Sequence, residues 1–231
     1  MYFLGIDVTY IIYVLPALIF TMIAQGMVQS AYHKASMMHN MRGMTGAQVA
    51  ECVLRTAGIT NVRIETTNGK LSDHFDPRSN VIRLSSEVYS GASIAAAGVA
   101  AHECGHAIQY AQAYGPIKLR NAIIPISQFG SAASMPLILL GFVFNFQALV
   151  TAGILFFGIA VLFQLLTLPV EFNASRRAMA ILDRAGILTN GELPEARRVL
   201  RAAAMTYVAA LLVSLMQLIR LIVLFGDRNK D

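Results

Sequence analysis

The chain has 231 residues, of which 56% are hydrophobic and only 13% are charged, and its mean hydropathy is +0.57. A soluble globular domain carries about 25% charged residues, so this composition excludes an ordinary soluble protein and indicates a membrane protein. The formal net charge is +5, but no basic run is interleaved with aromatic residues, so the sequence indicates no nucleic-acid partner.

Four apolar stretches predict four transmembrane helices. Residues 8–28 contain no charge, and about 20 residues suffice to cross a bilayer core. The 50 residues between Arg120 and Glu171 are also uncharged, enough for two spans joined by a turn near 145–147. The fourth stretch, 202–219, continues apolar to Phe225 apart from one arginine. The N-terminal tip has an Asp and no basic residue, so we expect the first span to be an uncleaved anchor.

The distribution of Lys and Arg predicts how these spans are oriented. Residues 29–120 and 171–201 lie on one side of the four spans and together carry 15 of the 18 basic residues. Since basic loops are retained in the cytoplasm, we expect a multi-pass protein of the cell membrane with this side cytoplasmic and both termini outside. Cys52 and Cys104 lie on the same side, so we expect them to be reduced thiols.

The region after the first span predicts a small α+β unit. Thr45 and Gln48 have the spacing of a helix capping box, and Gly58 is a natural helix end. Residues 61–66 alternate as a half-buried strand does, and Asn68-Gly69 indicates a turn. The further elements expected here are a strand at 81–85 and a helix over 90–114 that ends before Gly115-Pro116.

Beyond the third span, Glu171 is expected to open a short helix that ends at Ala185, and a last helix starts near Pro194 and continues into the fourth span. We therefore divide the chain into five parts. They are an N-terminal anchor (1–28), a first catalytic part (29–118), a transmembrane hairpin (119–170), a second catalytic part (171–201) and a C-terminal helix with its tail (202–231).

The stretch V-A-A-H-E-C-G-H-A-I-Q-Y-A at 99–111 places two histidines and a glutamate in an apolar helix. His102 and His106 are four residues apart, so on a helix their imidazoles point the same way and can hold one metal ion. Glu103 projects about 100° around the helix, where it can reach a metal-activated water without binding the metal. This spacing predicts a zinc site with Glu103 as the general base and acid.

A hydrolytic zinc site needs a third protein ligand. A third histidine six residues after His106 is excluded because position 112 is Gln, and every other histidine lies upstream. Glu171 is the candidate, because it is the first charged residue after 50 neutral ones. It lies where the transmembrane hairpin returns to the membrane interface, on the side where the motif helix ended. Two plainer interpretations stay open. In the first, the polar residues simply pair with one another in a helix bundle. In the second, Glu171 is an interfacial charge that opens its helix, where an acidic residue suits the helix dipole.

With these residues in view, the chain resembles the YugP-type membrane zinc metallopeptidases. These are neutral zinc metallopeptidases of gluzincin type, distantly related to the HtpX-like and CAAX prenyl proteases. Three stretches carry the resemblance: D-H-F-D-P-R-S-N-V-I-R-L-S at 73–85, A-A-H-E-C-G-H-A-I-Q at 100–109 and P-V-E-F-N-A-S-R-R-A at 169–178. The fold class implied is a mainly α membrane protein with about four transmembrane helices and a small gluzincin-like α+β catalytic domain.

The resemblance implies a role for particular residues. His102, His106 and Glu171 would bind one Zn²⁺ per chain, with Glu103 as the catalytic residue. Better-known membrane gluzincins have E-x-x-A-D, where the Asp supports a zinc-bound histidine. Here that position is Ser175, so Asn173 or Ser175 would take its place. Arg177 is a further candidate beside the ligands, and Arg177 or Tyr207 would stabilise the oxyanion.

The resemblance also implies where the substrate lies. The strand at 81–85 is similar to the edge strand on which gluzincins hold extended peptide by backbone hydrogen bonds. The residues expected to line the cleft are Asp73, His74, Asp76, Arg78, Val81 and Arg83.

The sequence therefore favours a membrane-embedded zinc endopeptidase that acts through a zinc-activated water. We expect peptide or protein substrates, membrane proteins above all, together with membrane lipid, and a homo-oligomer or regulatory partner stays open. Intramembrane cleavage with an Asp ligand is disfavoured, because 121–170 and 202–225 contain no Asp. The alternative is a non-catalytic membrane scaffold with a structural metal site.

Overall fold

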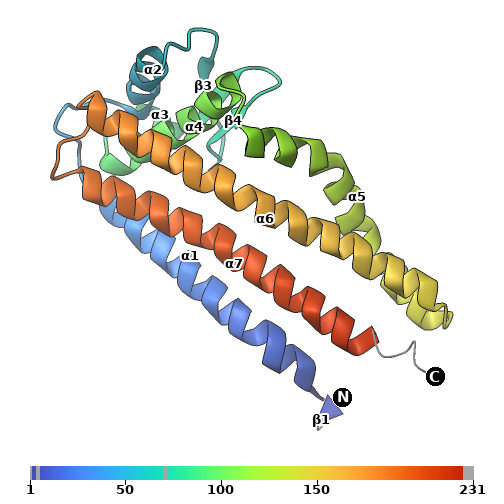
Figure 1. The fold of residues 1–231 in the computed structure, drawn as a ribbon. Helices are drawn as coiled ribbons and strands as arrows, with labels where there is room; N and C mark the ends of the chain where they lie inside the picture. The colour runs from blue at the N-terminus through green and yellow to red at the C-terminus, as the bar shows by residue number, and fades with distance from the viewer. Residues whose placement is uncertain (1, 4–5, 70–71, 226–231) are drawn as a thin grey trace. The chain divides into compact units, whose positions relative to one another are not determined.

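The computed structural model describes residues 2–3, 6–69 and 72–225 (Figure 1). Within these residues, four helices are long and apolar enough to cross a membrane. The first combines a π-helical turn, Tyr10–Val14, with α1, Leu15–Ser36. The others are α5 (Gly115–Val143), α6 (Gln147–Arg184) and α7 (Leu193–Phe225). The prediction of a mainly α membrane protein with four transmembrane helices is confirmed.

The helices are longer than the uncharged stretches from which they were predicted. The expectation that a separate helix begins at Glu171 is therefore wrong. Glu171 does not open a new helix, because α6 continues from Gln147 through Pro169 to Arg184. A proline removes one backbone hydrogen bond, but transmembrane helices tolerate this loss where neighbouring structure supports them. A favourable helix-dipole position therefore does not explain why Glu171 is acidic.

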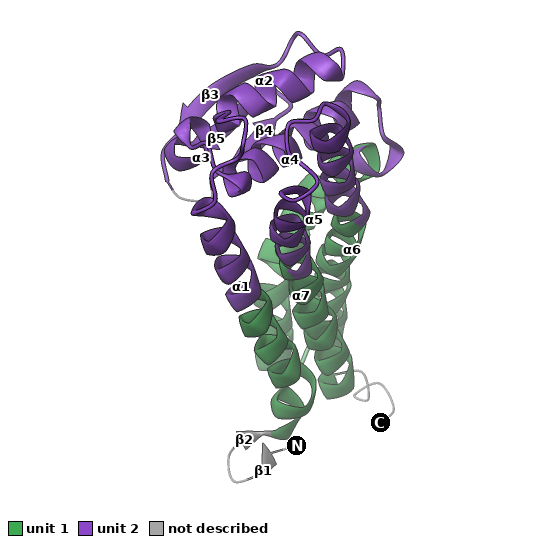
Figure 2. Ribbon diagram, turned by 90° about the vertical axis from the view of Figure 1, so that its left-hand side faces the viewer, with its two compact units in different colours: residues 1–24, 118–168, 206–231 green, residues 25–117, 169–205 purple. Residues whose placement is uncertain are grey.

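The chain forms two compact units (Figure 2). Unit 1 comprises residues 1–24, 118–168 and 206–231, and unit 2 comprises residues 25–117 and 169–205. In unit 1, α5 packs closely on α6 at Gly130. A Cβ at this position would lie only 3.0 Å from the Phe156 carbonyl oxygen, so the missing side chain lets the two helices approach. Of the polar side chains in α5, Ser127 and Ser134 are buried, whereas Gln128 and Ser131 are exposed. The five-part division made from the sequence stays a prediction.

Unit 2 contains a three-stranded sheet in the order β3–β5–β4. β3 (Arg63–Thr67) pairs in parallel with β5 (Val81–Ser85), and β4 (His74–Asp76) pairs antiparallel with the other side of β5. The expectation that 81–85 is an edge strand is therefore wrong. Because β5 lies between β3 and β4, the Asn68-Gly69 turn does not join two paired strands either.

The helices of unit 2 follow from local sequence signals. α2 (Gly46–Thr56) begins with the expected capping box, in which Thr45 and Gln48 exchange side-chain and backbone hydrogen bonds, and Gly58 follows its end with φ +72°. The helix expected over 90–114 is α4 (Ile94–Ala111), which begins later than expected because Ser93 caps its start. A short helix, α3 (Ser86–Ser90), precedes it. Strands β1 (Tyr2–Phe3) and β2 (Ile6–Asp7) form a separate antiparallel pair.

The core of unit 2 surrounds α4. Most side chains of α4 are small, so the neighbouring helices approach α4 closely. Buried alanines and aliphatic residues of α2, β5, α4, α6 and α7 form one apolar cluster, which includes Val49, Val53, Ile82, Leu84, Ala97, Ala100, Ala101, Cys104, Ala178, Leu182 and Ala196. Because this packing fixes α4 against α6, it determines which polar side chains of the two helices meet.

Candidate metal centre

Two helices bring His102, His106 and Glu171 together. The histidines lie one turn apart on α4, with ring centroids 4.8 Å apart and ring planes nearly perpendicular at 86°. Glu171 reaches them from α6, and its Oε2 lies 3.3 Å from His102 Nε2 and 3.6 Å from His106 Nε2. One ligand atom from each residue lies within 4.8 Å of the others.

These distances fit a single small metal ion. Zinc binds imidazole nitrogen and carboxylate oxygen at about 2.0–2.2 Å, so two ligands at tetrahedral angles lie about 3.3–3.6 Å apart. Glu171 is only 4% exposed, and its Oε2 is buried with no hydrogen-bond partner among the described residues. A buried carboxylate oxygen without a partner is destabilising unless a cation or proton compensates it. The residues present therefore fit a zinc ion.

The H-E-C-G-H sequence also explains why α6 comes so close. A Cβ at Gly105 would lie 2.5 Å from the Ala174 carbonyl oxygen, so only glycine lets the α6 backbone approach here. On the other side of α4, the buried Cys104 thiol lies 3.5 Å from the Ala50 carbonyl oxygen of α2. The two residues between Glu103 and His106 thus pack α4 against α2 and α6, and Glu171 lies three residues before Ala174 on the approaching helix.

Each imidazole is held through its other ring nitrogen. His102 Nδ1 lies 3.1 Å from Ser175 Oγ, and His106 Nδ1 lies 3.1 Å from Gln109 Oε1. If each Nδ1 carries the ring proton and donates it to these oxygens, both Nε2 atoms are free to bind a metal. Ser175 was a sequence candidate for this position. Gln109 was missed, although it is the one polar residue in an apolar stretch and is fully buried.

Gln109 connects the two helices behind His106. Its Nε2 donates to the Val170 carbonyl oxygen at 2.7 Å and to Asn173 Oδ1 at 3.0 Å. Asn173 Oδ1 also accepts from Arg177 Nε at 2.6 Å. Asn173 and Arg177 are thus linked to His106 through Gln109, whereas Ser175 contacts His102 directly.

The Arg177 guanidinium is held at the C-terminal end of α4. It donates a second hydrogen bond to Gln112 Oε1 and stacks 5.7 Å from the Tyr114 ring. Tyr207, the other candidate for the oxyanion, belongs to unit 1. The oxyanion roles of both residues stay predictions.

Glu103 differs from every other acidic residue in this region. It is 8% exposed, yet within the described residues its carboxylate has no hydrogen bond or ion pair. Burial lowers the pKa of the neighbouring His106 imidazole, but the carboxylates of Glu171 and Glu103 raise it more, so the net pKa lies above its usual value. The site therefore concentrates negative charge, as a cation site requires.

The residues expected to line a substrate cleft lie around β4 and β5, outside the His102–His106–Glu171 cluster. Asp73 accepts hydrogen bonds from the Ser85 backbone and hydroxyl. Hydrogen bonds from Ser79, Arg78 and Arg83 lower the pKa of the Asp76 carboxyl. Val81 is fully buried, and His74 is exposed. These contacts stabilise the sheet, and the substrate roles of the six residues stay predictions.

Comparison with known proteins identifies the family. A family described as "putative neutral zinc metallopeptidase" matches residues 10–226. The chain belongs to this family. It is also 45% identical to "Putative membrane protease YugP" of Bacillus subtilis (strain 168) over 202 residues, which cover 87% of this chain and 90% of that protein. No solved structure matches the chain.

The family assignment confirms the resemblance seen in the sequence. The match includes α4 and the whole of α6, so it contains the histidines and Glu171. Zinc is the metal that the family name implies, and the donor set of two imidazoles and one carboxylate is one that zinc prefers in hydrolytic sites.

Proposed function

We propose that this protein is a membrane-embedded, zinc-dependent endopeptidase. The observation that carries the proposal is the convergence of three ligand atoms beside a buried carboxylate, Glu103, that has no partner within the described residues. A structural metal site accounts for the three ligands but gives no role to the Glu103 carboxylate, which makes no hydrogen bond or ion pair within the described residues. A hydrolytic site uses both features.

Each residue has a distinct role in the proposed reaction. His102, His106 and Glu171 hold one zinc ion per chain, while Ser175 and Gln109 orient the imidazoles. Zinc in such a site acidifies water and polarises a carbonyl oxygen. Glu103 accepts the proton of the attacking water and delivers it to the leaving amine nitrogen, so that the peptide bond breaks between its carbonyl carbon and that nitrogen.

The sheet offers an extended peptide one edge close to α4. β4 pairs on one side only among the described strands, and Phe75 packs edge-on against Tyr110 of α4 at 5.4 Å. Strand addition at such an edge would align a peptide by backbone hydrogen bonds, as proposed above for 81–85. Because β5 is the central strand, β4 takes the role that the sequence assigned to β5.

We propose membrane proteins and their juxtamembrane segments as substrates, with the catalytic centre on the cytoplasmic side. The position of Lys and Arg supports this side, since the two segments that form unit 2 are the basic ones. The homologous protein is itself named a membrane protease.

The decisive test replaces Glu103 by Gln and measures zinc content and proteolysis of the full chain. We expect about one zinc per chain in both proteins, and a loss of hydrolysis of a casein-like or membrane substrate of at least about 10²-fold in Glu103→Gln. Glu51→Gln, an exposed change on α2, is the matched control and keeps full activity. Equal hydrolysis by wild type and Glu103→Gln would reject the mechanism, and no hydrolysis by either would favour the scaffold.

A further inference from the structure

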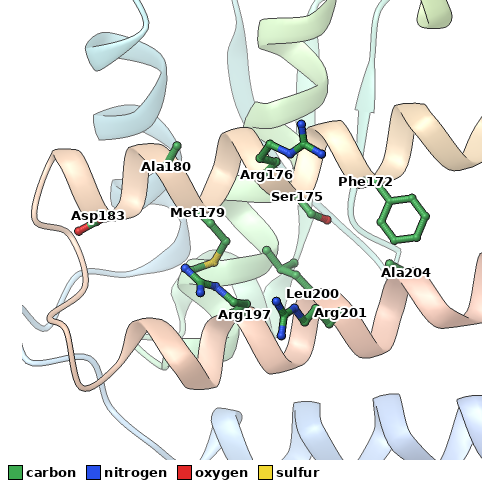
Figure 3. A pocket seen from close by; sticks show the side chains of 10 residues that line it. All are labelled: Phe172, Ser175, Arg176, Met179, Ala180, Asp183, Arg197, Leu200, Arg201 and Ala204. Carbon is green, nitrogen blue, oxygen red and sulfur yellow. The ribbon is translucent and has the colours of Figure 1, made fainter.

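A pocket lies in unit 2 on a different face of α6 from Glu171. Its volume is about 500 Å³, and it is formed by α6 and α7 (Figure 3). Successive residues rotate by about 100° around a helix, so Phe172, Arg176 and Met179 point roughly 80–140° away from Glu171. The lining residues are Phe172, Ser175, Arg176, Met179, Ala180, Asp183, Arg197, Leu200, Arg201 and Ala204.

The charge of this pocket is not compensated. Three arginines line it, against the single carboxylate of Asp183. None of these three guanidinium groups makes an ion pair within the described residues, whereas the adjacent Arg198 pairs with Glu195 at 3.4 Å. Arg197 and Arg201 are four residues apart on α7 and rise toward α6 (Figure 3). Two like charges held side by side favour an anion between them.

The arginines lie where the two helices leave their uncharged stretches. Arg176 follows Val170, the last residue of the 50-residue neutral segment, by six positions, or about 9 Å of helix. Arg201 is the last charge before the neutral stretch 202–219. Basic residues at the cytoplasmic end of a span lie at the level of lipid headgroups, where the surface is negatively charged.

The pocket is also graded along its length. Phe172 and Ala204 lie at the end toward the neutral stretches of α6 and α7, Arg176, Leu200 and Arg201 lie in the middle, and Asp183 and Arg197 lie toward the opposite end with Met179 and Ala180 (Figure 3). A phospholipid has the same gradient, from acyl chains to a phosphodiester.

We infer that this pocket binds the headgroup phosphate of an anionic phospholipid. Arg197 and Arg201 donate hydrogen bonds to its oxygens, Arg176 adds positive charge, and Phe172, Leu200 and Ala204 contact the glycerol and the first acyl carbons. Ser175 lines this pocket and also contacts His102, so a bound lipid lies next to the candidate metal centre. The inference rests on the pocket alone and does not require peptidase activity.

The test measures lipid retained by the purified full chain in detergent, by native mass spectrometry, with phosphatidylglycerol and phosphatidylcholine supplied in equal amounts. The wild type is expected to retain one phosphatidylglycerol selectively. The double variant Arg197→Gln/Arg201→Gln should lose this retention about tenfold. The matched control, Arg184→Gln/Arg198→Gln, removes the same charge from residues of α6 and α7 that do not line the pocket and should behave as wild type.

Thermal unfolding of the three proteins verifies that the exposed substitutions leave the fold intact. Equal retention in wild type and both double variants would overturn the inference, because binding would then not depend on the pocket. Two competitors identify the source of the anion. Displacement of the lipid by millimolar inorganic phosphate would show a free-phosphate site, and displacement by an acidic peptide would show a peptide site; either overturns the assignment to lipid.

Discussion

At the residue scale, the two candidate zinc histidines are supported by neutral partners. Ser175, at the position of the Asp in the E-x-x-A-D pattern of related membrane peptidases, contacts His102, and Gln109 contacts His106. A neutral oxygen orients an imidazole but raises its basicity less than a carboxylate does. In this proposal, geometry and burial hold the candidate metal centre more than charged partners of the histidines do.

This account predicts different effects of two changes at Ser175. Ser175→Ala removes the acceptor for His102 Nδ1 and should weaken zinc affinity about tenfold, within the range seen for such contacts. Ser175→Asp provides a charged acceptor at a half-buried position beside the pocket and should keep or strengthen the affinity. Competition with a zinc chelator measures both, and Ser131→Ala, at an exposed serine of α5, is the control. Unchanged affinity in Ser175→Ala would show that this contact does not orient the ligand.

Some residues of the candidate site could be predicted from the sequence, and others could not. His102, Glu103 and His106 follow from local spacing on one helix, and Glu171 stood out because no charge precedes it for 50 residues. Gln109 could not be assigned, because its role depends on contacts with Val170 and Asn173 on α6. Side chains whose partners lie on another helix are determined by packing, which one sequence does not show.

At the element scale, the close approach of α4 and α6 depends on one glycine. A methyl group at Gly105 would have to fit 2.5 Å from a backbone oxygen of α6, which cannot move like a side chain. The two helices must then separate, and Glu171 moves away from both imidazoles.

Gly105→Ala is therefore expected to destabilise the protein by about 1–3 kcal/mol and to lower its zinc occupancy. Gly26→Ala is the matched control, because Gly26 lies in α1 with no atom within 4 Å of the added Cβ. Its higher helix propensity should leave stability equal or slightly raised. Thermal unfolding and metal analysis of the two variants test this, and full zinc occupancy in Gly105→Ala would contradict the role of the close contact.

The elements show the same limit of sequence reasoning. The capping box of α2 and strand β5 were predicted to the residue, because their signals are local. The central position of β5 was not, since parallel pairing with β3 is a non-local choice. The continuity of α6 through Pro169 was missed because a proline next to the first charge resembles a helix boundary.

At the scale of the whole molecule, composition sufficed to predict a four-span membrane protein, and the spans expose large apolar side chains such as Met22, Leu139 and Leu155 as lipid-facing helices do. The sidedness follows only from the distribution of basic residues. Of the 18 basic residues, 13 lie in the segments that form unit 2, so one orientation is favoured.

The orientation predicts the reactivity of two introduced cysteines in intact cells. Phe144→Cys, in the turn between α5 and α6, should react with a membrane-impermeant maleimide, whereas Asn190→Cys, in the loop before α7, should react only after permeabilisation. Both positions are exposed, and the background carries Cys52→Ser, since Cys104 is fully buried. Labelling of Asn190→Cys alone in intact cells would reverse the proposed sidedness.

The central claim is that one zinc ion is held jointly by two turns of α4 and by α6. A crystal structure of the zinc-loaded protein, with the anomalous signal recorded at the zinc absorption edge, tests it most directly. We predict a single peak about 2.0–2.2 Å from His102 Nε2, His106 Nε2 and a carboxylate oxygen of Glu171. A peak bound by the histidines but lying well beyond coordination distance of Glu171, or located elsewhere in the molecule, would contradict the account.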